Sequence, residues 1–240
     1  MTIYAIGDIH GQLAMLEDAL QRIEMDGGPD ARIVFLGDYT DRGPDSRGVI
    51  ERLAQGKAEG RNWVFVMGNH DRMFSLFLAD YPRNDDRLLV GYHWLHPRIG
   101  GIETLETYGV DVPEGARIFQ IHEQARAAVP QSHQDFLDGL VPYHAEDGML
   151  FVHAGIRPGV ALEDQTEDDL IWIRQEFLTD PRPHPWLVVH GHTPVTAAEH
   201  AGNRVNLDSG AGYGRPLTAA VFEHGKAWVL TDGGRVPLEP

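Results

Sequence analysis

Residues 33–43 have the sequence IVFLGDYTDRG, and the fold can be inferred by working outward from them. Four consecutive apolar residues, two of them β-branched, predict a short buried strand. Gly37 and the charged residues Asp38, Asp41 and Arg42 follow this strand directly. In open α/β sheets, ligands bind beyond the carboxyl ends of the strands. The stretch therefore indicates a sheet whose carboxyl edge carries a polar site.

The same arrangement is found on both sides of this stretch. Apolar runs at 3–6 and 63–66 predict further strands, and apolar residues spaced three or four apart predict a helix over 13–25. A second helix is expected over 46–58. This βαβαβ order favours a largely parallel, layered α/β sheet. Later strands are expected at 150–152, 187–189, 205–207, 217–222 and 227–230, the last two as a hairpin.

The composition is that of a globular protein. The chain has 240 residues, of which 42% are hydrophobic and 23% charged, which excludes a disordered chain, a collagen-like repeat and a coiled coil. We expect one α/β domain over residues 1–240, with central β-sheets flanked by helices. Strand patterns are missing from about residue 80 to about residue 141, so a mostly helical insertion is expected there.

Charge and cysteine content exclude several classes of function. The formal net charge of −16 repels a phosphate backbone, so we expect no nucleic-acid partner. A phosphorylated substrate requires local positive charge, which metal ions could supply. The absence of cysteine excludes disulfides and thiolate nucleophiles. With no apolar run of 18 residues and no signal-peptide pattern at the N-terminus, we expect no membrane association and a cytoplasmic location. The oligomeric state is left open.

Five of the expected strands end in residues that could bind a metal ion or a phosphate. These are residues 8–10 (DIH), 37–43 (GDYTDRG), 68–71 (GNHD), His153 and 190–193 (HGHT). Each cluster alone is more often a turn or a structural hydrogen bond, and only their succession favours a shared site. Carboxylate, imidazole and amide ligands without thiolate suit Mn²⁺, Fe or Zn²⁺.

Four side chains have roles that follow from their chemistry and spacing alone. Asp8 and His10 are two residues apart, so in an extended segment they face the same side. The two carboxylate oxygens of Asp38 could bridge two ions roughly 3.5–4 Å apart. Arg42 could then donate a pair of hydrogen bonds to phosphoryl oxygens.

The clusters resemble a known family. The blocks at 7–11 (GDIHG), 37–43 and 68–71 are similar to the three signature blocks of the phosphoprotein phosphatases, within the calcineurin-like metallophosphoesterases. The blocks at 153–155 (HAG) and 191–194 (GHTP) are similar to that family's two later histidine blocks. The resemblance extends from residue 5 to about residue 222, and it is greatest to the compact bacterial and bacteriophage serine/threonine protein phosphatases. It implies the layered fold of that family.

The resemblance implies a centre of two divalent ions, with Mn²⁺ favoured and Fe or Zn²⁺ as alternatives. The first ion would be held by Asp8, His10 and Asp38, and the second by Asp38, Asn69, His153 and His192. It also implies direct hydrolysis by a hydroxide held between the metals, without a phosphoenzyme. His70 would be the general acid, Asp41 would orient His70, and Arg42 and Arg174 would hold phosphoryl oxygens.

Two positions bear on the substrate and favour different answers. Asp41 is typical of the protein phosphatases, and the related symmetrical diadenosine tetraphosphatases usually lack an acid there. Met67 stands where the protein phosphatases usually place an arginine, and the tetraphosphatases have an apolar residue there. We expect a serine/threonine protein phosphatase acting on a phosphorylated protein. The alternatives are a dinucleotide polyphosphate hydrolase, an enzyme acting on another small phosphoester, or a non-catalytic binding module.

Several polar residues near these blocks are given supporting roles. Asp71 is expected beside the site or at the start of a helix, and His190 is expected to be structural. Asp208 is expected to close a strand, and the nearby Tyr213 to lie in a turn.

Overall fold

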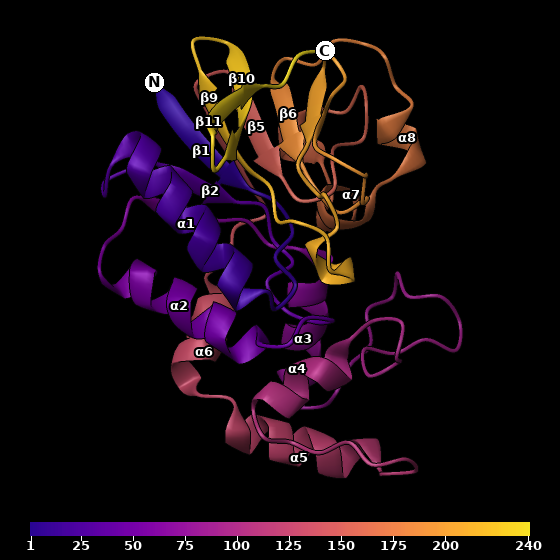
Figure 1. Cartoon of the computed structure of the whole chain (residues 1–240). Coiled ribbons are helices and arrows are strands. Elements are labelled where there is room, and N and C mark those ends of the chain that lie inside the picture. The colour runs from indigo at the N-terminus through magenta and orange to yellow at the C-terminus, as the bar shows by residue number, and fades with distance from the viewer.

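The computed structural model describes all 240 residues and contains two β-sheets lying against each other, with helices on their outer faces (Figure 1). The first sheet has the order β11-β10-β9-β1-β2-β3. Its strands are β1 (Thr2–Ile6), β2 (Ile33–Phe35), β3 (Trp63–Phe65), β9 (Ala219–Glu223), β10 (Lys226–Thr231) and β11 (Gly234–Pro237). The strands β1, β2 and β3 are parallel, whereas β9, β10 and β11 extend the sheet in antiparallel pairing.

The second sheet has the order β4-β5-β6-β8-β7. Its strands are β4 (Tyr143–Glu146), β5 (Met149–Val152), β6 (Leu187–His190), β7 (Glu199–His200) and β8 (Arg204–Asn206). The three middle strands are parallel and the two edge strands are antiparallel.

The expected central β-sheets flanked by helices are confirmed, and the βαβαβ segment supplies the parallel strands β1, β2 and β3. Tight hairpins add antiparallel strands to both sheets, which the sequence pattern did not predict beyond the last hairpin. His224 and Gly225 join β9 to β10 with φ of 51° and 72°. Asp147 and Gly148 join β4 to β5 with φ of 49° and 75°. Two-residue turns with positive φ at both positions match the twist of antiparallel strands. The expected hairpin between the last two predicted strands is confirmed, while β4, β7 and β11 were not predicted.

The helices cover the outer faces of the sheets. Those following β1, β2 and β3 are α1 (Leu13–Gly27), α2 (Ser46–Ala58) and α3 (Asn69–Leu78). The insertion contributes α4 (Gly101–Thr107), α5 (Ile118–Ala128) and α6 (Gln131–Asp138), which pack against α2 and α3 (Figure 1). The chain between α3 and α4 is mostly turns. The second sheet is flanked by the short helices α7 (Glu167–Trp172) and α8 (Gln175–Leu178), and two 3₁₀ turns lie at Leu162–Asp164 and Ala211–Tyr213.

Alternate residues of the first sheet face two different cores. Ile3 and Ala5 of β1 lie in the core between the sheets, together with Phe151 of β5. Tyr4 and Ile6 lie in the core beneath the helices. Because both faces of β1 are buried, the strand appears in the sequence as a continuous apolar run. No helix is both long and apolar enough to cross a membrane.

Candidate active site

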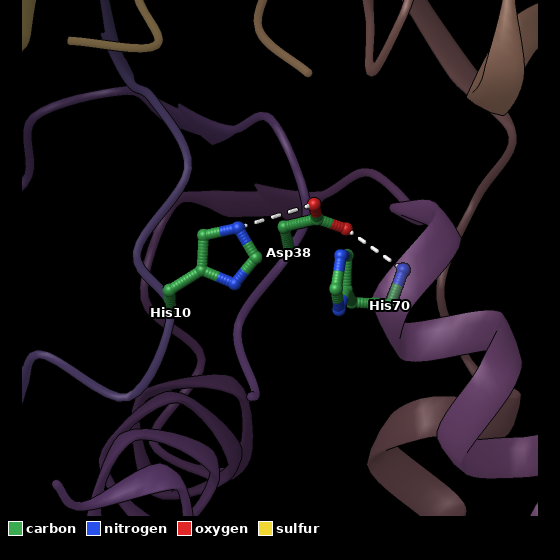
Figure 2. Close-up of side chains that lie close together, drawn as sticks. All are labelled: His10, Asp38 and His70. Atoms are coloured by element: carbon green, nitrogen blue, oxygen red, sulfur yellow. Dashed lines mark hydrogen bonds and ion pairs between the residues drawn. The ribbon is translucent and has the colours of Figure 1, made fainter. Parts of the chain in front are cut away.

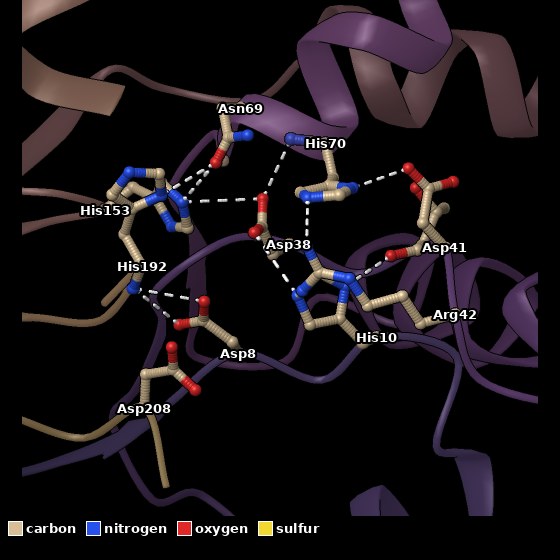
Figure 3. Close-up of polar contacts among 12 residues, drawn as sticks. Asp8, His10, Asp38, Asp41, Arg42, Asn69, His70, His153, His192 and Asp208 are labelled. Atoms are coloured by element: carbon tan, nitrogen blue, oxygen red, sulfur yellow. Dashed lines mark hydrogen bonds and ion pairs between the residues drawn. The ribbon is translucent and has the colours of Figure 1, made fainter. Parts of the chain in front are cut away.

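The polar side chains that follow the parallel strands converge at the seam between the two sheets (Figure 3). Asp38 follows β2, and Asn69 and His70 begin α3 just after β3. His153 directly follows β5 and His192 lies two residues beyond β6, so these ligands come from the second sheet. The carboxyl edges of both sheets therefore supply one site.

Asp38 lies between two groups of potential ligands (Figure 3), and Figure 2 shows it with the first group, His10 and His70. Its Oδ2 lies 3.4 Å from Nε2 of His10, and its Oδ1 lies 3.5 Å from Nε2 of His153. Ligand atoms of His10, Asp38 and His70 lie within 4.8 Å of one another, as do those of Asp38, His153 and His192. The two carboxylate oxygens thus face different histidines, as a residue bridging two ions must do.

His153 shows that a cation fits this space. Its Nδ1 donates a hydrogen bond to the carbonyl of Leu36 at 2.8 Å, and burial lowers the pKa of His153 to about 4. The ring is therefore neutral with a lone pair on Nε2. That nitrogen lies 3.0 Å from Oδ1 of Asn69 as well as facing Asp38. Convergent lone pairs on nitrogen and oxygen are the donor set that a divalent ion satisfies.

His10 is arranged in the same way. Its Nδ1 donates to the carbonyl of Thr40 at 2.8 Å, and burial lowers the pKa of His10, so Nε2 again carries the lone pair. That lone pair faces Asp38 and accepts a hydrogen bond from Arg42 Nη1 at 2.7 Å. The backbone hydrogen bonds of His10 and His153 fix the tautomer in which Nε2 can bind a metal.

His192 and Asn69 complete the second group. Nδ1 of His192 lies 2.9 Å from Oδ1 of Asn69, and Nε2 of His192 is buried without a hydrogen-bond partner. The backbone N–H of His192 donates to both oxygens of Asp8, at 3.2 and 3.1 Å. Asp8 was expected beside His10 and Asp38, but it belongs to neither of the two close groups. The third member of the group that contains His10 and Asp38 is His70. Burial and the neighbouring Asp208 raise the pKa of Asp8.

Backbone strain is concentrated at the site. Seven residues other than glycine have positive φ, and five of them are His10, Asp38, Asp41, Arg42 and His192. Such conformations are costly for residues with a Cβ atom and are retained where surrounding structure over-determines them. The concentration of strained residues here therefore indicates that these loops serve a function beyond connecting strands and helices.

The general-acid candidate is hydrogen-bonded to its expected partner. Nδ1 of His70 lies 2.6 Å from Oδ2 of Asp41, and both side chains are buried. Burial raises the pKa of Asp41 to about 7, and hydrogen bonds from Thr104 and Trp94 oppose that rise. Burial and the charge of Arg42 lower the pKa of His70. On the other side of the ring, Nε2 accepts a hydrogen bond from Arg42 Nη2 at 2.9 Å.

The remaining predicted residues lie at the margin of the site. Arg174 is exposed at the start of α8, and its charge contributes to lowering the pKa of His70 and of His192. Met67 lines a separate cavity of about 600 Å³ beside α3. The ring of Tyr213 is exposed and lies 5.0 Å from the guanidinium of Arg42.

Three residues at or beside the site were not predicted as part of it. Trp94 and Thr104, in the insertion, donate hydrogen bonds to the carboxylate of Asp41. Asp208, expected only to close a strand, is buried near Asp8 and raises its pKa. No strand or helix pattern in the sequence marks Trp94 or Thr104. A buried tryptophan followed by two glycines at 100 and 101 is the one signal that could have been used.

These features define a metal-dependent phosphoester hydrolase. Residues 1–223 match the family model described as calcineurin-like phosphoesterase, and the chain belongs to that family, whose members use a dinuclear divalent metal centre. It is 27% identical to the bis(5'-nucleosyl)-tetraphosphatase PrpE (asymmetrical) of Halalkalibacterium halodurans, with 90% of this chain and 88% of that protein covered.

Two solved structures share the fold. A putative diadenosine tetraphosphatase is 23% identical with a TM-score of 0.64, covering 99% of this chain and 94% of the other. A cold-active protein-tyrosine phosphatase of a psychrophilic Shewanella species is 16% identical with the same TM-score of 0.64, covering 99% and 80%. Enzymes with different named substrates therefore have this fold.

Proposed function

We propose that this protein hydrolyses phosphomonoesters of alcohols and is a serine/threonine protein phosphatase. The observation that carries the proposal is the buried hydrogen bond of 2.6 Å between His70 and Asp41. A serine or threonine alkoxide is a poor leaving group, so its departure gains from a positioned proton donor. A nucleotide leaving a polyphosphate chain is already a stable anion and gains less. The dyad therefore favours an alkyl phosphate substrate.

Each residue of the site would have a distinct role in the reaction. Asp8, His10, Asp38, Asn69, His153 and His192 would hold two divalent ions, for which we propose Mn²⁺. Bound ions would supply activated water and neutralise negative charge on the phosphoryl group. Arg42, released from His10 and His70, would donate to phosphoryl oxygens, with Arg174 entering from α8. Once Arg42 no longer donates to Nε2 of His70, that nitrogen would take up a proton from solvent, with the positive ring stabilised by Asp41, and would give this proton to the leaving oxygen. We propose one metallophosphoesterase domain over 1–240, with the insertion at about 80–141.

The second candidate is hydrolysis of a dinucleotide polyphosphate. It is favoured by the names of relatives such as the Halalkalibacterium halodurans protein and by the apolar Met67. The resemblance in the sequence suggested symmetrical cleavage, whereas those relatives are named asymmetrical. The two modes differ in their products, because diadenosine tetraphosphate yields two ADP when cut symmetrically and ATP plus AMP when cut asymmetrically.

The test compares substrates under one set of conditions. Protein loaded with Mn²⁺ is assayed with phosphoserine and phosphothreonine peptides, a phosphotyrosine peptide and diadenosine tetraphosphate, with nucleotide products separated by chromatography. Turnover of the phosphoserine or phosphothreonine peptides with little cleavage of the dinucleotide is the expected result. Efficient release of ATP and AMP with inert peptides would overturn the proposal in favour of the second candidate. Asp38→Asn serves as the control for contaminating phosphatases.

A further inference from the structure

The Asp41 carboxylate is held by hydrogen bonds from the insertion. Trp94 Nε1 donates to Oδ2 at 2.9 Å and lies 3.2 Å from Oδ1. Thr104 Oγ1 donates to Oδ1 at 2.7 Å and accepts from the backbone N–H of Asp41 at 2.8 Å. Both oxygens therefore have a donor from the insertion, and the remaining contact of Oδ2 is with Nδ1 of His70.

The two donors are themselves fixed by packing. Asp41 and Thr104 are fully buried and Trp94 is 1% exposed. The indole of Trp94 lies against Phe74 and Phe77 of α3, with ring centroids 5.0 and 4.8 Å apart. Since α3 also carries His70, the indole of Trp94 packs against the helix that holds the imidazole. Thr104 lies in α4, so two parts of the insertion meet at one carboxylate.

The insertion also contacts the backbone of the next residue. Gly100 has φ of +103°, and a Cβ atom there would lie 2.4 Å from the backbone nitrogen of Arg42. The N–H of Arg42 donates to the carbonyl of Gly100 at 3.3 Å. The strained pair Asp41 and Arg42 therefore rests directly on the segment between Trp94 and Thr104.

We propose that Trp94 and Thr104 are positioning residues of the hydrolytic reaction, which fix Asp41 and, through it, the orientation of the His70 ring. With both carboxylate oxygens held, Oδ2 presents one direction to Nδ1–H of His70, and Nε2 is turned towards Arg42 (Figure 3). In the reaction Nε2, free of Arg42, takes up a proton from solvent and passes it to the leaving oxygen, while the Nδ1 proton remains shared with Asp41. The proposal rests on the general-acid role assigned to His70 above.

The first test separates proton delivery from binding. Thr104→Val removes the hydroxyl while keeping the shape, Thr104→Ser retains the hydroxyl, and Trp94→Phe removes the indole N–H. With phenyl phosphate, whose leaving group needs protonation, we expect kcat of Thr104→Val and Trp94→Phe to fall roughly tenfold or more, as for loss of one hydrogen bond to a buried charged group. KM should be unchanged, Thr104→Ser should retain kcat, and the loss with p-nitrophenyl phosphate should be smaller.

The second test asks whether Thr104 acts through His70. Adding Thr104→Val to His70→Asn should cause no further loss of kcat, because the group being positioned is gone. An equal further loss in that background, or equal losses with both leaving groups, would overturn the proposal and indicate a structural role. Melting temperature and metal content are measured for every variant. If Thr104→Val does not fold, Trp94→Phe takes its place in the combination with His70→Asn.

If the general-acid role of His70 is wrong, the experiments give a different result from the one expected if only the positioning role of Trp94 and Thr104 is wrong. If His70 is not the general acid, His70→Asn alone would keep its kcat with phenyl phosphate. A readout independent of turnover is the downfield proton NMR signal of the His70 Nδ1–H, assigned by its loss in His70→Asn. It should broaden or shift in Thr104→Val and be restored in Thr104→Ser. An unchanged signal in Thr104→Val would contradict the proposed positioning.

Discussion

Oδ2 of Asp71 accepts a hydrogen bond from the backbone N–H of Asp38 at 2.8 Å. The same oxygen accepts from the N–H of Gly68 at 2.9 Å, and the other carboxylate oxygen accepts from Tyr39 at 2.9 Å. Asp71, in the first turn of α3, therefore ties the loop after β2 to the loop after β3. The position of the proposed bridging ligand depends on a residue that is not itself proposed as a ligand.

Asp71→Asn should therefore weaken metal binding. The amide has one accepting oxygen where the carboxylate has two, so at least one buried backbone N–H loses its partner. We expect a destabilisation of about 1–3 kcal/mol and a fall in Mn²⁺ affinity of roughly tenfold. Calorimetric titration and urea denaturation measure the two effects. Asp45→Asn is the matched control, since Asp45 caps α2 and asparagine caps a helix as well. Wild-type affinity in Asp71→Asn would contradict the supporting role.

Asp38→Asn should lose metal and activity together. The amide nitrogen cannot serve as a second ligand, so the two groups of histidines would no longer share a bridging residue. Metal analysis after gel filtration should show fewer than two ions per chain, with turnover of p-nitrophenyl phosphate near the background. Asp80→Asn, an exposed residue paired with Arg126, controls for the loss of one negative charge. An Asp38→Asn protein with two ions and normal turnover would rule out the bridge.

Gly100→Ala should lower both stability and kcat. An alanine at φ of +103° is strained, and its Cβ would collide with the backbone of Arg42. Gly91→Ala is the matched control, because Gly91 has φ of +87° with no atom within 4 Å of a Cβ. The control should lose only about 1–2 kcal/mol of stability from backbone strain and none of its kcat. Equal behaviour of the two variants would show that the contact with Arg42 is unimportant.

His190 should make the protein sensitive to acid. Burial lowers the pKa of His190 to about 3, and its Nε2 has no partner, so the folded protein keeps the ring neutral. The unfolded chain takes up a proton below about pH 6.5, so the free energy of unfolding falls as the pH drops from there towards 3. In His190→Gln this loss is absent. Relative to the variant, the wild type should lose up to about 1.4 kcal/mol per pH unit.

Urea denaturation of the metal-free proteins at pH 7.5, 6 and 5 measures that difference. Chelator is present throughout, so that proton binding by the other histidines is not confused with metal release. A difference in stability between wild type and His190→Gln that does not change over this range would show that His190 takes up a proton as readily in the folded protein as in the unfolded chain, and would contradict the prediction.

The sequence predicted the strands of both sheet centres and the convergence of residues beyond them. Strands such as β1, β2, β5 and β6 are continuous apolar runs because both of their faces are buried, whereas β8 has a polar residue on either side of Val205. Of the four edge strands, only β3 was predicted; β7 has just two residues and β11 contains glycine and proline. The division into two mixed sheets depends on which strands pair with one another over long distances in the chain. No local sequence pattern reveals this long-range pairing.

Within the candidate site, the residues that follow strands were predicted and those that support them were not. Trp94 and Thr104 lie 53 and 63 positions beyond Asp41, in a part of the chain without a strand pattern. Their contact with Asp41 is created by the packing of the insertion against α2 and α3. Arg42 was predicted to face a phosphate, and the structure places its guanidinium between His10 and His70.

His153 and His192 follow strands of the second sheet. Asp38 and Asn69 follow strands of the first. An ion bound among them would link Asn69 to His153, 84 positions further along the chain, and to His192, 123 positions further along. Metal binding and docking of the sheets are then linked equilibria, because a ligand that binds only the folded state adds its binding free energy to that state. A cell short of the metal would hold fewer intact molecules of this protein, rather than the same number working slowly.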